Sequence, residues 1–393
     1  MQNAQLINGH RLATAMGRLG TESAFEVLAR AKALESTGRE VIHLQIGEPD
    51  FDTPDNIVEA GIKALRDGYT HYGPAHGLPE LREAIAANSL QRRGIEHAPD
   101  QVLVTPGAKP VMFYVILALC QPGDEVIYPN PGFPIYESMI KFVGARPVPM
   151  PLLAKNNFRV DVDRFAADLT DRTRLVILNS PGNPTGGAFT GEDMAAMAEL
   201  LADRDVIILA DEIYKDIIYD QRFHSITQFG DLARKTVILD GFSKSYAMTG
   251  WRLGYALGPR DLIDAMAQLQ VNAVSCTAGF VQMAGVEALN GPQDSVHAMV
   301  EEFRARREIV VELLNGIEGV HCPRPEGAFY AFPEFGPDAG ELADRLLNEA
   351  GVAVLGGSAF GEFGSTGMRV SFANSRENLR AALAKVKELV ESG

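Results

Sequence analysis

Short, uninterrupted apolar segments alternate with helical patterns through the middle of the chain. The segments that predict strands are 101–105 (QVLVT), 125–128 (EVIY), 175–178 (LVIL), 206–210 (VIILA) and 236–239 (TVIL). Apolar runs without alternation are typical of strands that are covered on both faces. The stretches between them, for example 191–202 and 260–269, have the length of helical crossover connections. We therefore predict an α/β fold with a large, mostly parallel sheet.

The C-terminal part of the chain follows a different pattern. It combines amphipathic helical patterns with short apolar pieces, at 301–314, 375–390, 329–332, 352–355 and 368–371. We interpret this part as a smaller α+β domain. The predicted division is an N-terminal arm with part of the small domain (1–48), a large domain (49–285) and the small C-terminal α+β domain (286–393).

Polar and Gly- or Pro-rich residues directly follow four of the predicted strands, at their carboxyl ends. In open α/β sheets, ligands bind beyond the carboxyl ends of the strands. We therefore expect these residues to line one edge of the sheet. They are Gly107, Ala108, Lys109, Asn179, Asn183, Asp211, Tyr214, Ser243 and Lys244.

The composition is that of an ordinary globular protein of two or three domains, with 393 residues, of which 46% are hydrophobic and 22% charged. The net charge of −15 argues against nucleic acid as a partner and requires local cations for any anionic ligand. Cys120, Cys276 and Cys322 are widely spaced, so neither a disulfide framework nor a metal site is expected. Residues 1–20 lack the apolar core of a signal peptide, and the longest apolar run, 111–120, has about half the length of a bilayer crossing. We expect a cytoplasmic protein that does not bind a membrane.

Lys244 follows the predicted strand 236–239 in a loop of small residues, within GFSKSYAMTGWRLG. Burial lowers the pKa of an amine and makes it available as a nucleophile. A solvated loop lysine is the commoner situation in proteins. However, Arg252 follows in the same run, among glycines that let the backbone approach a phosphate closely. Taken alone, Arg252 is equally compatible with a surface ion pair.

This run resembles the lysine signature of the fold-type I pyridoxal-phosphate-dependent aminotransferases (class I/II), which it matches at every restricted position. The resemblance covers about residues 24–390 and is greatest to the bacterial aspartate-aminotransferase-like branch, of which MTGWR is typical. It implies a large domain with a mostly parallel sheet of the seven-stranded type, a smaller α+β domain, and a homodimer with active sites at the subunit interface. It also implies that pyridoxal 5′-phosphate forms a Schiff base with Lys244 and that Arg252 pairs with its phosphate.

The resemblance assigns Asn183, Asp211 and Tyr214 to the cofactor ring. Asp211 matches the carboxylate that keeps the ring nitrogen protonated, so that the ring can absorb electrons. Asn183, which also adjoins the substrate, and Tyr214 match the donors to the phenolic oxygen. Lys244, once displaced by the substrate, would move a proton as base and acid, so Lys244, Asp211 and Tyr214 are the expected catalytic residues. The alternatives are a helix N-cap for Asp211 and turn or core positions for the other two.

Other matches concern the substrate and the outer contacts of the cofactor. Arg369, in MRVSFA, matches the arginine that binds the substrate α-carboxylate bidentately, with an inter-strand ion pair as the alternative. Gly47, in GEPDF, matches a segment that approaches the same carboxylate. Tyr72 matches the tyrosine that reaches the cofactor phosphate of the other subunit. Phe133, in NPGFPIY, matches an aromatic ring placed against the cofactor, with loop packing as the alternative.

The turn 107–109 opens a helix directly after a strand, which makes it a candidate phosphate site. One departure from the family lies near the lysine. Many relatives carry serine or threonine three residues before it, whereas this chain has Gly241, which leaves Ser243 as a substitute phosphate contact.

A second departure concerns the substrate side chain. The classical acidic-substrate aminotransferases use an arginine from the other subunit, and 270–280 (QVNAVSCTAGF) contains none. The chain resembles the family branch with GxK at 107–109, in which this lysine and a serine of the N-terminal arm replace that arginine. The resemblance implies that Lys109, together with Ser23, contacts an acidic side chain. The alternative is that Lys109 adds charge near the phosphate or points to solvent.

These observations predict a reversible, ping-pong transfer of an amino group between an L-amino acid and a 2-oxo acid, with aspartate/glutamate-type or broad specificity. A lyase, a decarboxylase or a cyclase that uses the same cofactor on the same fold is the alternative. The first predicted strand is not followed by GxGxxG, which excludes a nicotinamide dehydrogenase. The short N-terminal arm argues against a regulator with an attached DNA-binding domain.

Overall fold

A seven-stranded sheet forms the centre of the computed structural model, which describes residues 6–7 and 10–392. Strand β10 is antiparallel to both of its neighbours, β4 and β9, and the other pairs are parallel. The prediction of a mostly parallel α/β sheet is therefore confirmed. In spatial order the strands are β4 (Val102–Thr105), β10 (Gly254–Leu257), β9 (Thr236–Gly241), β8 (Ile207–Asp211), β7 (Thr173–Asn179), β5 (Glu125–Asn130) and β6 (Arg146–Pro151).

Two of these strands, β6 and β10, were not predicted from the apolar pattern. The sequence of β6, RPVPMP, contains three prolines, which lack the N–H group needed inside a sheet. The strand lies at the edge of the sheet, where one of its sides has no neighbour to bond. The sequence of β10, GYAL, is too short to show a period, and its pairing with β4 and β9 decides its conformation.

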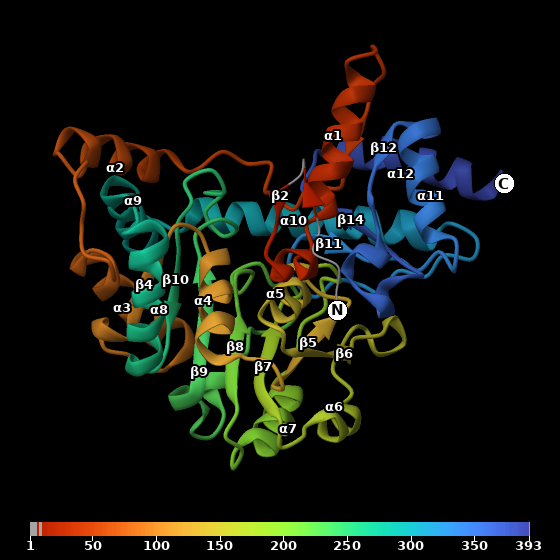
Figure 1. The fold of residues 1–393 in the computed structure, drawn as a ribbon. Helices are drawn as coiled ribbons and strands as arrows, with labels where there is room; N and C mark the ends of the chain where they lie inside the picture. Colours follow the sequence, from red (N-terminus) through yellow and green to blue (C-terminus); the bar gives the residue numbers. More distant parts are fainter. Residues whose placement is uncertain (1–5, 8–9, 393) are drawn as a thin grey trace.

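Helices cover both faces of the sheet (Figure 1), and successive residues of β7 belong to two different apolar clusters. Leu175 and Ile177 pack with apolar residues of α4, α5, α8 and α10, whereas Val176 and Leu178 pack with α6 and α7. This arrangement explains why the strands are apolar at successive positions. The helices are α4 (Lys109–Leu119), α5 (Ile135–Val143), α6 (Val162–Asp168), α7 (Gly191–Leu201), α8 (Arg260–Val274) and α10 (Asp294–Asn315).

At the β4 end of the sheet, a separate apolar cluster joins the sheet to three further helices. Val104 and Tyr255 contribute to it from the sheet. The helices are α2 (Asp55–Arg66), α3 (Pro79–Arg93) and α9 (Gly279–Asn290).

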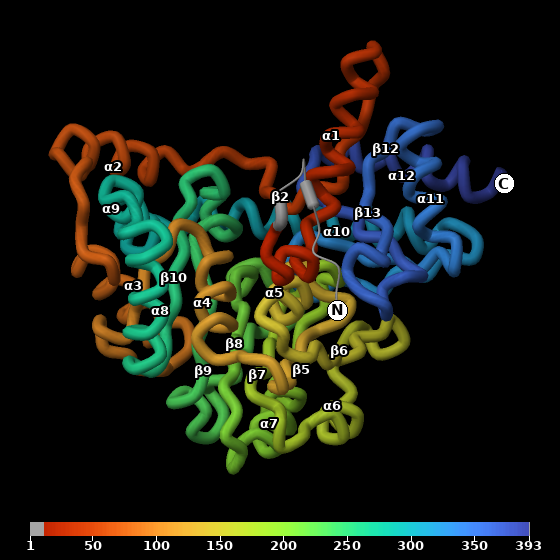
Figure 2. The backbone as a smooth tube through the Cα atoms, in the orientation of Figure 1, coloured from red at the N-terminus to blue at the C-terminus, as the bar shows by residue number. Residues whose placement is uncertain are grey.

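The C-terminal part contains a three-stranded antiparallel sheet and a parallel pair of strands that includes β3 from the N-terminal part. The N-terminal helix α1 lies beside this part (Figure 2), and its Ala31 belongs to an apolar cluster with Leu347 and Ala353. The elements are α1 (Ser23–Glu35), β3 (Ile42–His43), β11 (Tyr330–Ala331), α11 (Ala339–Arg345), β12 (Val352–Ala353), β13 (Leu355–Gly356), β14 (Met368–Ser371) and α12 (Arg376–Glu391), and β1 (Leu6–Ile7) pairs with β2 (His10–Arg11). The division at residues 48 and 285 stays a prediction.

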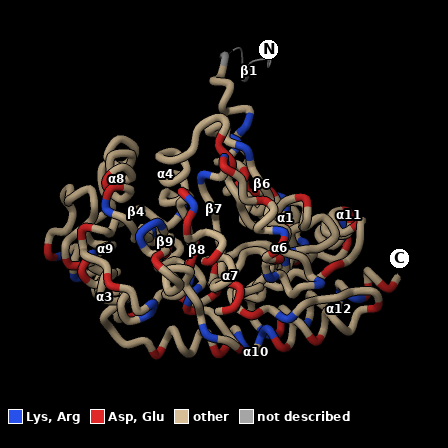
Figure 3. The backbone as a smooth tube through the Cα atoms, turned by 90° about the horizontal axis from the view of Figure 1, so that it is seen from below, with Lys and Arg blue, Asp and Glu red and all other residues tan. Residues whose placement is uncertain are grey.

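Charges of both signs alternate along α10 (Figure 3). Glu302 accepts hydrogen bonds from Arg306, within α10, and from Arg376 of α12, at 2.9 and 2.6 Å. The Arg376–Glu302 pair joins the two helices, which also share an apolar cluster that includes Phe303 and Leu379. Among the described helices, none is both long and apolar enough to cross a membrane.

Candidate active site

A cavity of about 470 Å³ lies where the carboxyl ends of the central strands meet the N-terminal arm and the C-terminal sheet. The structure brings twelve of the fourteen predicted site residues to its wall: Ser23, Gly47, Ala108, Lys109, Phe133, Asn183, Asp211, Tyr214, Ser243, Lys244, Arg252 and Arg369. Gly107 and Tyr72 do not line it. Asn179, which was also expected at this edge, does.

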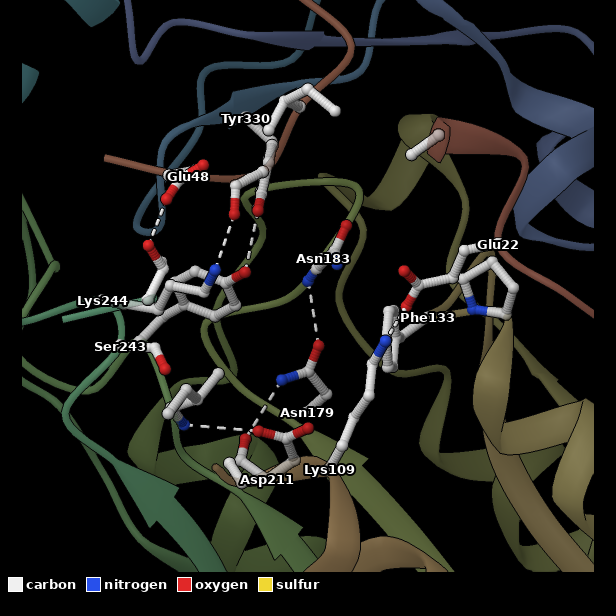
Figure 4. Close-up of a pocket in the computed structure, with 18 of the residues that line it drawn as sticks. Glu22, Glu48, Lys109, Phe133, Asn179, Asn183, Asp211, Ser243, Lys244 and Tyr330 are labelled. Atoms are coloured by element: carbon white, nitrogen blue, oxygen red, sulfur yellow. Dashed lines mark hydrogen bonds and ion pairs between the residues drawn. The ribbon is translucent and has the colours of Figure 1, made fainter. Parts of the chain in front are cut away.

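Lys244 follows the end of β9 and reaches into the cavity, where its Nζ donates a hydrogen bond to the Gly47 carbonyl at 2.6 Å (Figure 4). The pKa of this amine is lowered to about 8, mainly because the amine is buried; Glu48 acts to raise the pKa, and the positive charges of Arg369 and Arg252 act to lower it. The amine is therefore much more often neutral at neutral pH than an ordinary lysine. It has the properties of a nucleophile and of a base.

Asp211 is the last residue of β8 and is buried at the floor of the cavity. Its carboxylate accepts a hydrogen bond from the Tyr136 hydroxyl at 2.5 Å and another from the Ile213 N–H at 3.3 Å. Burial raises the pKa of Asp211 to about 7, although both hydrogen bonds lower it. A positively charged group in the cavity would favour the ionised carboxylate.

Tyr136 was not predicted as a site residue. It lies in the same NPGFPIY segment as Phe133, three residues further on, and the two rings pack edge to face with centroids 5.7 Å apart. The sequence predicts an aromatic contact from this segment, but only the structure shows which of its aromatic rings contacts Asp211.

Arg369, on β14, is buried and faces Asn183 across the cavity. Its guanidinium donates to the Asn183 side-chain oxygen at 2.9 Å and to the Gln45 carbonyl at 2.5 Å. Its Nε atom is buried and has no hydrogen-bond partner among the residues that the structure describes. The hydrogen bonds of Arg369 to those residues are to neutral oxygen atoms, so its charge is available to an anionic ligand.

Tyr214 and Tyr330 lie together beside Arg369. Their hydroxyl groups are 2.8 Å apart, and the ring centre of Tyr330 lies 4.7 Å from the guanidinium carbon of Arg369. Tyr330 also fits closely over Gly47, where any side chain would overlap its hydroxyl group. Tyr330 was missed in the sequence because it lies in β11, far along the chain from every predicted motif.

Gly107, Ala108, Gly254 and Arg252 pack against one another at the start of α4. Gly107 has φ +89°, and a side chain there would overlap the Arg252 guanidinium. A Cβ on Gly254 would lie 2.5 Å from the Ala108 nitrogen. These glycines therefore let an arginine and a helix N-terminus come together, which is a suitable arrangement for a phosphate.

Gly241, the residue at the position where many relatives carry a hydroxyl, has a structural explanation. It pairs with Gly254 of β10, and a Cβ there would lie 2.9 Å from the Gly254 Cα and 3.0 Å from the Leu253 carbonyl. The backbone of β10 occupies the space that a serine or threonine would need. Ser243 lines the cavity instead.

A buried ionic network lies behind this edge of the sheet. Arg93 contacts Glu212 at 2.7 Å and Asp240 at 2.9 Å, and Lys215 contacts Asp240 at 2.9 Å. All four side chains are at most 5% exposed. Because Glu212 and Asp240 adjoin Asp211 and the lysine loop, the network fixes the ends of β8 and β9.

The opposite side of the cavity is built partly by the N-terminal arm. Lys109 Nζ lies 2.7 Å from Glu22 Oε1 and 5.4 Å from the centre of the Phe133 ring. Figure 4 shows Glu22 and Lys109 pointing toward each other beside Phe133, away from Lys244. Glu22 was not predicted as a site residue. Ser23, which was, is the next residue and begins α1.

Tyr72 lies outside the cavity, between α2 and α3, and is 90% exposed. In the single chain, Tyr72 is not part of the wall of the cavity that contains Lys244 and Arg252. Its contact with the cofactor of another subunit stays a prediction.

The groups of the cavity fit pyridoxal phosphate. The aldehyde of this cofactor reacts with an amine of lowered pKa, and its ring nitrogen keeps a proton when a buried carboxylate lies beside it. Its phosphate suits an arginine at a helix N-terminus. Lys244, Asp211 and Arg252 provide these three groups within one cavity.

Comparisons with known proteins identify the family of this chain. The family model "Aminotransferase class I and II" matches residues 39–386. A probable aspartate/prephenate aminotransferase of Aquifex aeolicus is 40% identical over 97% of this chain and 98% of its own length. The crystal structure of the aspartate aminotransferase from Rhizobium meliloti has a TM-score of 0.92 at 38% identity and covers 98% of this chain and 99% of its own. An aromatic aminotransferase from Pyrococcus horikoshii has a TM-score of 0.87 at 38% identity, over 92% and 99%. The chain belongs to the class I and II aminotransferases.

Proposed function

We propose that this aminotransferase holds pyridoxal phosphate on Lys244 and moves the amino group of an L-amino acid to a 2-oxo acid in two half-reactions. Aspartate and glutamate are expected among its substrates, together with neutral amino acids. The proposal is carried by one observation: a lysine whose pKa is lowered to about 8 shares a cavity with the buried Asp211, with Arg252 and with Arg369. The relatives named above as aspartate and as aromatic aminotransferases support a broad range of side chains.

In the proposed complex, Arg252, Ser243 and the turn 107–109 hold the cofactor phosphate, and Asp211 holds the proton on the ring nitrogen. Asn183 and Tyr214 donate hydrogen bonds to the phenolic oxygen, and Phe133 lies against the ring. When bound, pyridoxal phosphate serves as an electron sink for negative charge at the substrate α-carbon. Tyr136 keeps Asp211 oriented, since its hydroxyl donates to that carboxylate.

Arg369 is proposed to bind the substrate α-carboxylate. Its buried, unpartnered Nε and its NH1 group, which in this structure contacts Asn183, are directed donors that favour a bidentate carboxylate. A carboxylate held there fixes which bond of the α-carbon is labile. Lys244 then takes the α-proton as a general base and returns a proton as an acid, and its low pKa suits both steps near neutral pH.

A lyase, a decarboxylase or a cyclase would use the same cofactor-binding residues. A half-reaction screen separates these functions: each amino acid is mixed with the holoenzyme, and conversion of the cofactor to its amine form is followed by absorbance. An aminotransferase stops after one turnover unless a 2-oxo acid is added. Continued turnover without an acceptor would contradict the proposal.

We further propose a homodimer in which Tyr72 contacts the phosphate bound to the partner subunit, because its side chain is 90% exposed in the single chain. Mixing Tyr72→Phe chains with Lys244→Ala chains tests this. If Tyr72 acts in trans, each hybrid has one site with both defects and one with neither, so activity returns. Stable hybrids without recovered activity would assign Tyr72 to its own subunit.

A further inference from the structure

Few cationic side chains line the cavity, and the proposed function already assigns most of them to a ligand group. Among the described residues that line it, the cationic side chains are Lys109, Lys244, Arg252 and Arg369. The proposed function uses the last three for the cofactor and for the substrate α-carboxylate. A substrate with a second carboxylate therefore depends on Lys109, since an unpaired buried charge is strongly unfavourable.

Lys109 already has a carboxylate partner from its own chain. Glu22 Oε1 lies 2.7 Å from Lys109 Nζ, and the Glu22 side chain is only 14% exposed, whereas that of Lys109 is 43% exposed. Glu22 Oε1 is buried and has no directed hydrogen bond from any residue that the structure describes, so this contact is an ion pair of poor hydrogen-bond geometry. Such a pair provides charge neutrality without the directional bonds that would make it hard to separate.

The position of Glu22 is set by the arm rather than by the central sheet. It immediately precedes α1, whose contacts through Ala31 are with the C-terminal part. The Phe133 ring lies beside this pair, with its centre 5.4 Å from Lys109 Nζ, and Phe25, which follows Ser23 and Ala24 in α1, also lines the cavity. This end of the cavity therefore offers apolar surface and a neutral ion pair.

We propose that Glu22 is a specificity-determining residue that occupies Lys109 in place of a substrate side-chain carboxylate. Neutral amino acids enter with the Glu22–Lys109 pair intact, whereas aspartate or glutamate must displace Glu22 to reach Lys109. Glu22 thus permits neutral substrates, which would otherwise leave Lys109 unpaired, and weakens acidic ones. This inference rests on the proposed function, because it concerns the substrate side chain at that site.

The test is the first half-reaction of the holoenzyme in single turnover, so that no amino acceptor enters the measurement. Aspartate is compared with asparagine, which has nearly the same shape and no side-chain charge. Glu22→Gln should raise the second-order rate constant for aspartate about tenfold and change that for asparagine by less than about twofold. In the double variant Glu22→Gln/Lys109→Met the gain for aspartate should disappear, because it requires the freed lysine.

Glu26→Gln is the matched control. Glu26 lies in the first turn of the same helix but does not line the cavity, so this variant removes the same charge from the arm without touching Lys109. The ratio of its second-order rate constants for aspartate and asparagine should equal that of the unmodified chain. A gain equal to that of Glu22→Gln would assign the effect to the general charge of the arm and overturn the inference.

Binding of maleate, an unreactive dicarboxylate, gives a readout that does not depend on turnover. Calorimetry on the holoenzyme should show a Kd about tenfold lower in Glu22→Gln than in the unmodified chain. If Glu22→Gln transfers amino groups but leaves both the aspartate-to-asparagine ratio of rate constants and the maleate Kd unchanged, the role of Glu22 is overturned while the proposed function stands. Absence of amino transfer from every donor would overturn the proposed function and, with it, this inference.

Discussion

The two ends of the cavity differ in how the chain builds them. At the end proposed to hold the cofactor, Asp211 is the last residue of β8, and Lys244 lies in the loop that follows the neighbouring strand β9. The buried ionic network of Arg93 lies behind both strands. At the side-chain end, Lys109 meets Glu22, which comes from the N-terminal arm and leaves Lys109 43% exposed. Functional groups of the first kind are fixed by buried backbone, whereas those of the second kind can be displaced or exchanged at small cost. The proposed reaction type and the proposed substrate preference therefore depend on different parts of the molecule.

Replacing Lys244 should have the largest effect, because the cofactor attachment and the proton transfer are lost together. Lys244→Ala is expected to lower kcat by about 10⁴-fold. In the unmodified holoenzyme, borohydride reduction followed by mass spectrometry should place the cofactor on this lysine. Finding it on Lys109 would reverse the assignment of the two ends.

Asp211→Ala should leave a folded protein that binds the cofactor but transfers the proton slowly. The carboxylate acts on charge that develops during the reaction, so kcat should fall about 10²- to 10³-fold while KM changes little. Asp211→Asn, which keeps the shape and removes the charge, should show a similar loss. Near-normal kcat in both variants would mean that another group protonates the ring.

The pH dependence of cofactor attachment sharpens the contrast between Lys244 and an ordinary lysine. Its pKa lies at about 8 instead of 10.5, so its neutral form should increase about tenfold per unit as the pH rises toward 8 and then level off. The unfolded chain holds this proton more tightly, so between about 8 and 10.5 the stability contributed by Lys244 rises with pH. Attachment rates of pyridoxal phosphate to the cofactor-free protein measure the first effect. Rates that keep rising through pH 10 would contradict the lowered pKa.

Lys109→Ala should have the smallest and most selective effect. The lysine is partly exposed and contributes about 1 kcal/mol to a carboxylate contact, so kcat/KM for aspartate or glutamate should fall about tenfold. Alanine and aromatic donors should be affected much less. Equal losses for acidic and neutral donors would assign Lys109 to the cofactor and remove the functional difference between the two ends.

Local signals were sufficient for much of the cofactor end. Strand ends such as Asn179, Asp211 and the Ser243–Lys244 loop could be placed at one edge, because parallel strands bring their carboxyl ends together whatever their order. The family resemblance then assigned roles that the apolar pattern alone does not contain. The edge strand β6 was missed because its prolines removed the local signal, and the internal strand β10 was missed because it is short.

The sequence by itself determined the fold class and the aminotransferase family and predicted the position of the reactive lysine, since each depends on a periodic pattern or on a contiguous motif. Only the tertiary structure decided that Tyr136 holds Asp211, that Tyr330 covers Gly47, and that Glu22 reaches Lys109. These pairs join positions far apart in the chain and have no spacing of their own. Their contacts depend on how the arm and the C-terminal sheet pack over the strand ends, which is a property of the assembled core.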